Sequence, residues 1–296
     1  MSALLGNPMV TTAALPLLLG VVMGLLARLA LPASLLFLLW AALLLFFYWD
    51  TLGPPVVPPV AASQKLIYLA FAGIILGPLS QRLDAGAGRV LVIVALAAAF
   101  SWLGWRRVAG GALDLQMIAA LAAGLLAIVG AALLLPARTL PSPPVEEPFL
   151  VPAAMLAMCL CGAIASVLGA SIVTGQLLGS IAALAGGWCL VQYVAVLRGG
   201  EAVAWSKGSE LTLVFAGATV LIQVALLAPK ANPAALVLSS LPLIMAALVR
   251  GPLQGLVPRV RPLRPLAAGL LIAMPAMLAI LTALLWAPHG AALGFS

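Results

Sequence analysis

The sequence predicts an all-α protein, a polytopic helical bundle that crosses a membrane about ten times. Composition leads to this prediction first: of 296 residues, 65% are apolar and 7% are charged, and the mean hydropathy is +1.25. Soluble domains carry roughly 25% charged residues, so 14 basic and 7 acidic side chains cannot cover a water-facing surface of this size. The apolar residues also gather in runs close to the roughly 20 residues that a spanning helix needs.

The first half of the chain contains five of these runs. A tight turn at Pro32 ends the first run, and an aromatic cluster that suits a membrane interface ends the second. A proline-dense linker at 50–64 is expected to be extended, and the pair Arg106 and Arg107 stops the fourth run. The predicted spans are residues 10–31, 33–49, 65–80, 89–105 and 115–135.

The second half repeats this rhythm after a proline-rich linker at 136–148. No charged residue occurs between Glu147 and Arg198, a length that requires two crossings, and we expect the turn between them at Gly175. Lys207 and Glu210 are assigned to the loop that follows. The predicted spans are residues 149–174, 176–197, 211–228, 234–249 and 266–286.

The spacing of landmarks predicts an internal duplication. The first turns, at Pro32 and Gly175, are 143 residues apart, and Arg106 and Arg250 are 144 residues apart. The third and eighth spans begin 146 residues apart, at 65 and 211. The domains are therefore expected to be two five-helix halves, 1–142 and 143–296. Because five spans start the second half from the opposite side, the repeat would be inverted, as in many carriers.

The basic residues predict the orientation, because loops rich in Lys and Arg stay in the cytoplasm. With ten spans, ten basic residues fall on one side and four on the other, so both termini are expected outside the cytoplasmic (inner) membrane of a bacterium. The first side receives Arg28, Arg82, Arg89, Arg138, Arg198, Lys207, Arg250, Arg259, Arg261 and Arg264, and the other receives Lys65, Arg106, Arg107 and Lys230.

Arg28, the arginine pair Arg106 and Arg107, and the loop arginines Arg259, Arg261 and Arg264 are interpreted as interface and topology residues. Arg28 lies near the end of its span and can extend to the interface. A contact with a substrate or a lipid headgroup is the alternative role for Arg28.

Several classes of function are disfavoured by the residues. The basic residues are scattered between apolar runs, which argues against nucleic acid as a partner. The lone histidine, His289, cannot build a multi-histidine metal or haem site. Met155, Met158, Cys159 and Cys161 could offer soft ligands to Cu(I), but they are interpreted as packing residues. The sequence therefore predicts no metal and no cofactor.

The polar residues of the spans give two readings. Small residues recur every four positions between 162 and 187, and such stripes let helices approach closely. The polar groups near them either bond neighbouring helices or line the path of a weakly polar solute. The candidate path residues are Ser171, Thr174, Gln176, Ser180, Gln192, Tyr193 and Gln223.

Three functional hypotheses remain open. The first is a secondary transporter or exporter of a small neutral or weakly polar solute, supported by the span count, the repeat and the prolines within spans, Pro16, Pro242 and Pro275. The second is a non-catalytic subunit or assembly factor, with other membrane proteins or a second copy as partners besides the bilayer. The third, a lipid-modifying enzyme, is disfavoured because acids that could do catalysis, such as Asp50 and Asp114, lie at span ends.

Overall fold

The computed structural model describes residues 10–29, 31–110, 114–135, 144–228 and 230–286. Within these residues the fold is all-helical, and ten helices are long and apolar enough to cross a membrane. The prediction of an all-α protein with ten candidate spans is confirmed for this part of the chain. His289 and Arg138 lie outside the described residues.

The helices follow the predicted order with small changes at their ends. A π-helical turn, η1 (Val10–Ala14), leads directly into α2, and a 3-10 turn, η2 (Gln254–Leu256), lies between the last two spans. The spanning helices are α2 (Leu15–Ala27), α3 (Ala33–Leu52), α4 (Ala62–Gln81), α5 (Ala85–Ala109), α6 (Leu115–Leu134), α7 (Glu147–Leu168), α8 (Ile172–Leu197), α9 (Lys207–Leu227), α10 (Pro233–Arg250) and α11 (Leu263–Trp286).

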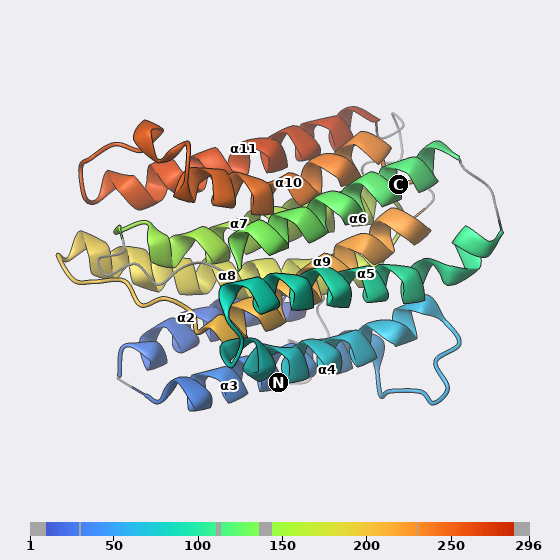
Figure 1. The fold of residues 1–296 in the computed structure, drawn as a ribbon, viewed down its shortest axis with the longest axis horizontal. Helices are drawn as coiled ribbons and strands as arrows, with labels where there is room; N and C mark the ends of the chain where they lie inside the picture. The colour runs from blue at the N-terminus through green and yellow to red at the C-terminus, as the bar shows by residue number, and fades with distance from the viewer. Residues whose placement is uncertain (1–9, 30, 111–113, 136–143, 229, 287–296) are drawn as a thin grey trace.

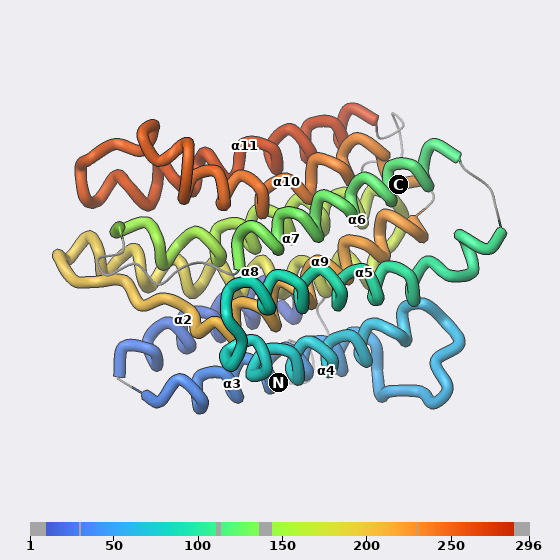
Figure 2. Tube along the Cα trace, in the orientation of Figure 1, coloured from blue at the N-terminus to red at the C-terminus, as the bar shows by residue number. Residues whose placement is uncertain are grey.

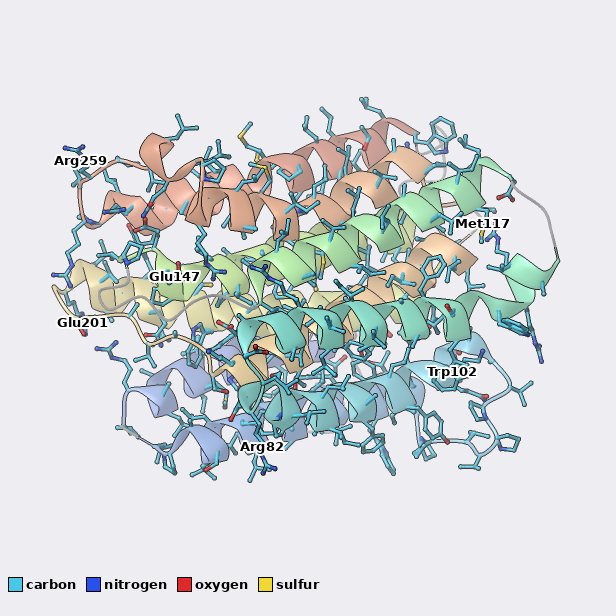
Figure 3. The ribbon with its side chains drawn as sticks, in the orientation of Figure 1. Arg82, Trp102, Met117, Glu147, Glu201 and Arg259 are labelled. Carbon is cyan, nitrogen blue, oxygen red and sulfur yellow. The ribbon has the colours of Figure 1, made fainter. Side chains whose placement is uncertain are left out.

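The helices run back and forth along the long axis of the molecule (Figures 1 and 2). Helices α2, α4, α6, α8 and α10 therefore end where α3, α5, α7, α9 and α11 begin, and we call this the basic end. Figure 3 places Glu147, Glu201 and Arg259 there, and Trp102 and Met117 toward the opposite end. The described basic residues at this end are Arg28, Arg82, Arg89, Arg198, Lys207, Arg250, Arg259, Arg261 and Arg264.

Helix α9 forms the centre of the bundle. In its most apolar stretch 89% of the residues are buried, against 28% in α5. It packs along α4 and also touches α5, α6, α7, α8 and α10. A helix that is apolar on all faces is expected to be surrounded by other helices, and the surface helices instead turn one apolar side outward, as lipid-facing helices do.

Glycines set the contact between α2 and α8, which run in the same direction. A Cβ atom at Gly187 would lie 2.7 Å from the backbone nitrogen of Val21, and one at Gly24 would lie 2.8 Å from Cβ of Val191. The absence of side chains therefore lets the two backbones meet, as the four-residue spacing of small residues predicts.

The turn between α7 and α8 corrects one prediction. The expected turn at Gly175 is wrong, since the chain turns at residues 169–171 and Gly175 lies in the first turns of α8. Ala170 adopts a left-handed conformation with φ of 64°. A Cβ atom at Gly175 would lie 2.7 Å from Cγ2 of Val167, so this glycine serves close packing instead of the turn. One of the three spacings behind the predicted duplication is thereby lost, and the inverted repeat stays a prediction.

Helix α9 begins earlier than its apolar run suggests. Lys207 and Glu210, expected in a loop, lie in its first turn. The hydroxyl of Ser206 accepts a hydrogen bond from the backbone N–H of Ser209 at 3.2 Å and so caps the helix. The basic and acidic side chains are thus held on a helix at the basic end.

An aromatic cluster fixes the segment before α9 to the bundle. The Trp205 ring lies 5.3 Å from the Trp40 ring of α3 and 6.1 Å from the Trp188 ring of α8, measured between centroids. Tilted and edge-on aromatic pairs at such distances are favourable beyond their buried area. The segment that precedes α9 is therefore held against α3 and α8.

Candidate functional site

Six charged residues from four helices meet at the basic end, and we call them the ionic cluster. Two come from the start of α7, two from the first turn of α9, one from the end of α10 and one from the start of α11. These residues are Glu146, Glu147, Lys207, Glu210, Arg250 and Arg264.

Two ion pairs organise the cluster. Arg250 Nη2 lies 2.7 Å from Glu147 Oε1, joining α10 to α7. Arg264 Nη2 lies 2.6 Å from Glu146 Oε1, joining α11 to the start of α7. Charged groups in such an environment require partners, because removing them from water costs several kcal/mol.

The pairs are largely shielded and incompletely bonded. The side chain of Glu146 is 2% exposed, and those of Glu147 and Arg250 are each 19% exposed. Within the described residues, Oε2 of both glutamates and Nε of both paired arginines have no hydrogen-bond partner. A buried polar atom without a partner costs about 1–3 kcal/mol. Because these atoms already lack partners, an exchange of partners between the ion pairs would cost little additional free energy.

Glu210 completes the cluster from the central helix. Its side chain lies close enough to Arg250, Lys207 and Glu147 to interact with them electrostatically. Three acidic side chains thus lie beside three basic ones. Arg250 is shared, since its guanidinium also donates to the backbone oxygen of Leu134 at the end of α6. Moving Arg250 would therefore affect α6, α7 and α9 together.

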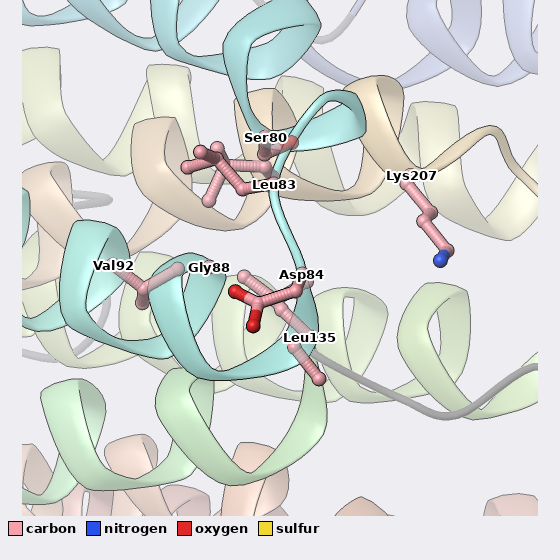
Figure 4. Close-up of a pocket in the computed structure, with 9 residues that line it drawn as sticks. Ser80, Leu83, Asp84, Gly88, Val92, Leu135 and Lys207 are labelled. Atoms are coloured by element: carbon pink, nitrogen blue, oxygen red, sulfur yellow. The ribbon is translucent and has the colours of Figure 1, made fainter.

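A small polar pocket adjoins the cluster between α4, α5, α6 and α9. Its volume is about 60 Å³, room for very few water-sized molecules. Ser80, Asp84 and Lys207 are its polar lining, and Leu135 borders it next to the carbonyl that Arg250 binds. Figure 4 shows Asp84 beside Leu135 and Lys207 extending from the start of α9. The pocket and the ionic cluster together make a polar region at the basic end.

The predicted path residues are not gathered at one place. Ser171 and Thr174 do lie together, with hydroxyl oxygens 2.6 Å apart, and Thr174 is also 2.5 Å from the hydroxyl of Ser166. These bonds close the turn between α7 and α8. Gln192 donates to the Gly24 carbonyl at 3.2 Å and accepts from the N–H of Val203 at 3.0 Å, so it ties α2 to the segment before α9.

The remaining path residues lie on other contacts. Tyr193 donates to the Pro262 carbonyl at 3.2 Å, on the side of α8 that faces the connection to α11. Ser180 is buried on α8, and Gln176 is half-buried on the same helix. Gln223 is 5% exposed on α9, and its Oε1 has no partner within the described residues. Ser171, Thr174, Gln192 and Tyr193 thus hold parts of the bundle together. Gln223 keeps an acceptor available, and a substrate path through these residues stays a prediction.

Met155, Met158 and Cys159 pack against the central helix. A Cβ atom at Gly217 of α9 would lie 2.7 Å from Cε of Met155 and 2.9 Å from Sγ of Cys159. Met274 and Met277 are exposed on α11. In the part of the chain that the structure describes, no group of three or more His, Cys, Asp or Glu side chains is placed to hold a metal ion.

The interface arginines differ in their partners. Arg107 Nη2 lies 3.1 Å from Asp114 Oδ2, and its guanidinium also donates to the backbone oxygen of Leu226. Arg106, next to it, is exposed. Arg28 donates to the Glu201 carbonyl at 3.0 Å, and Arg261 donates to the Gly200 carbonyl at 3.1 Å. Arg259 is exposed, and Arg264 belongs to the ionic cluster.

Sequence reasoning missed the ionic cluster, although it assigned Arg250 and Arg264 to the same end of the bundle. Glu146 and Glu147 were expected in a linker, and Glu210 in a loop. A usable signal was present, because spans that alternate in direction bring the starts of the sixth, eighth and tenth spans to one end. In a chain with only 7 acidic residues, Glu146, Glu147 and Glu210 near the starts of these spans, at the same end as many basic residues, indicate pairing.

Comparison of the chain with protein-family models, with curated proteins and with solved structures gives no match.

Proposed function

We propose that this ten-helix membrane protein is a secondary carrier or exporter of a small neutral or weakly polar solute, and that the ionic cluster is the gate at its basic end. In the proposed orientation the basic end faces the cytoplasm of a bacterium and the two termini lie outside.

The position of the two ion pairs carries this proposal. They link α7 to α10 and α11, and through Glu210 they reach the central helix α9. A carrier exposes its site to one side at a time by moving one group of helices against another. Ion pairs across the ends of these helices can hold one such state, and their incomplete bonding lowers the cost of exchanging partners.

Gln223 supports a neutral or weakly polar solute. Its amide lies buried on α9, and its unpaired oxygen can accept a hydrogen bond from a hydroxyl or amide group. Ser239 and Ser240 of α10, both fully buried, donate to carbonyls of their own helix. A charged solute would require a countercharge at this depth.

The dense centre of the bundle favours a second candidate function, a non-catalytic subunit of a larger membrane complex. Helix α9 is enclosed by its neighbours. The larger grooves lie on the lipid-facing sides of the helices. One is the apolar groove of about 350 Å³ between α7, α8 and α11, which Leu160 and Leu270 line. A partner helix could occupy such a surface.

Transport through reconstituted vesicles tests the proposal. A variant with Cys at 147 and 250, and with the natural cysteines replaced by Ala, would be joined by a short bifunctional thiol reagent. We expect counterflow of one member of a panel of radiolabelled glycerol, urea, monosaccharides and neutral amino acids, and we expect cross-linking to stop it. The uncross-linked variant controls for the two substitutions, and R82C/R259C, treated with the same reagent at exposed positions of the same end, controls for labelling.

Two results separate the candidates. Solute flux that persists after cross-linking would contradict the gate, although not the carrier. Purification in mild detergent with another membrane chain in fixed ratio, together with no flux for any member of the panel, would contradict the carrier and support the complex subunit.

A further inference from the structure

A second groove at the basic end combines an apolar wall with arginines. It lies between α2 and α8 and has a volume of about 540 Å³. Leu25, Leu190 and Val194 line its apolar part, and Arg28 and Arg198, the residues that end α2 and α8, line the part nearest the aqueous boundary. The groove opens toward the lipid, since Leu25 and Leu190 are each 54% exposed.

Three guanidinium groups gather around the loop that closes this groove. Arg28 donates to the backbone oxygen of Glu201 at 3.0 Å, and Arg261 donates to that of Gly200 at 3.1 Å. Gly200 itself lines the groove. Each of these bonds uses one of the five N–H groups of its guanidinium, so both side chains are positioned and still able to donate.

The charges at this groove are uncompensated. The side chain of Arg198 is exposed and, among the described residues, makes no ion pair or hydrogen bond. No acidic side chain lines the groove. A single arginine at the C-terminus of a helix is explained by the helix dipole. Here the C-termini of α2 and α8 each carry an arginine, and Arg261 adds a third from the connection between α10 and α11. The helix dipoles alone do not explain so large a positive region.

We propose that this groove binds a phospholipid with an anionic headgroup. The phosphate lies between Arg28 and Arg198, and one acyl chain lies along Leu25, Leu190 and Val194. Basic pockets between spanning helices on the cytoplasmic side suit such headgroups, and guanidinium groups bind phosphate through paired hydrogen bonds. The apolar wall directly below the arginines fits a molecule that has an acyl chain attached to its phosphate.

The groove between α7, α8 and α11 serves as an internal comparison. It is also apolar and open to lipid, but none of the residues that line it is charged. Any lipid should fill that groove without selection for headgroup. The proposal therefore concerns selectivity for charge at the α2–α8 groove, and it holds whether or not the chain is a carrier.

Native mass spectrometry of the full chain, delipidated in detergent and titrated with phosphatidylglycerol or phosphatidylcholine, tests this site. We expect one phosphatidylglycerol to be retained at least about tenfold more tightly than phosphatidylcholine, from about 1 kcal/mol for each arginine. The double variant R28Q/R198Q should lose this preference, and R28K/R198K should keep part of it. R82Q/R259Q, altered at exposed arginines elsewhere on the same end, should behave as the unaltered chain.

A second pair of variants tests the apolar wall without changing charge. Val194→Trp, which fills the groove, should weaken phosphatidylglycerol binding, and Leu270→Trp in the α7–α8–α11 groove should not. Equal retention of the two lipids by the unaltered chain would overturn the proposal, as would unchanged selectivity in R28Q/R198Q together with unchanged phosphatidylglycerol binding in Val194→Trp. Displacement of the lipid by an equal concentration of inorganic phosphate would also overturn it and indicate a site for free phosphate.

Discussion

Arg250 connects more of the molecule than any other described cation of the ionic cluster. It pairs with Glu147, interacts with Glu210 and donates to the carbonyl of Leu134, so one side chain serves α6, α7, α9 and α10. The sequence showed the arginine at the end of a span, but its partners lie 40, 103 and 116 positions away and cannot be assigned from local pattern.

Replacing Arg250 by Gln should lower stability. The change leaves the shielded carboxylate of Glu147 without its cation, and such loss costs about 1–3 kcal/mol. The thermal unfolding midpoint in mild detergent, followed by circular dichroism, would measure it. Arg259→Gln, at an exposed arginine of the same end, is the control and should leave the midpoint unchanged.

A double variant checks that the loss comes from the pair. Because E147Q/R250Q removes both charges of the ion pair, it should be less destabilised than the sum of its two single variants. Strict additivity would show that Arg250 and Glu147 act independently.

Asp114 predicts a dependence on pH at the opposite end. The backbone N–H of Met117, which donates to its carboxylate at 2.6 Å, and the Arg107 guanidinium beside it hold the pKa of Asp114 below its ordinary value of 3.8. Its contribution to stability is therefore complete above pH 3.8 and is lost as the pH falls through the lower pKa of the folded state.

Asp114→Asn should remove this component. Asn still caps α6 but carries no charge, so the fall in unfolding midpoint between about pH 5 and about pH 2.5 should be shallower than in the unaltered chain. Asp84→Asn, another helix cap without an ion pair in the described residues, is the comparison. Parallel curves for unaltered and Asp114→Asn proteins would contradict the assignment.

At the scale of elements, the packing of α2 against α8 depends on small residues at particular positions. Gly187→Ala should be destabilising by about 1–3 kcal/mol, the typical cost of overpacking, because the added carbon would meet the backbone of α2. Gly186→Ala is a closely matched control, since its nearest neighbour would be Leu156 Cδ1 at 3.5 Å. Equal unfolding midpoints for the two variants would show that the helices separate easily.

The helices themselves were easier to predict from the sequence than the residues at which they begin and end. The existence of each span followed from its apolar run, because a bilayer requires about 20 such residues. The turn between α7 and α8 was misplaced because glycine serves both turns and close helix contact, and only the neighbouring helix decides which applies at Gly175. The early start of α9 was missed because charged residues were taken to mark a loop. Lys207 and Glu210 instead belong to the first turn of the helix, where they join the ionic cluster.

At the scale of the whole molecule, the sequence predicted the class and span number and left the arrangement open. Apolar runs do not specify which spans touch, so the central place of α9 and the ionic cluster could not be derived. The same limit applies to the candidate path residues. Gln192 and Thr174 were polar groups within spans, and either a solute or a neighbouring helix could have satisfied them.

Reporter fusions test the predicted orientation. If the basic end faces the cytoplasm, alkaline phosphatase fused after Ser296 should be active in a bacterial host, and green fluorescent protein at the same position should stay dark. The same reporters fused after Arg198, at a truncation on the basic end, should give the reverse pattern. Fluorescence from the fusion after Ser296 would contradict the predicted outward terminus.

The enclosed position of α9 has a consequence for biogenesis. Among the described spans it is the eighth in chain order, so its neighbours α3 to α8 are made before it, whereas α10 follows. Until α9 arrives, the earlier spans have no partner along the faces that it later covers, and lipid or an insertion factor must occupy that space. The central helix therefore joins the bundle after six of its neighbours, and it has to displace what occupies its position before the protein reaches its mature form.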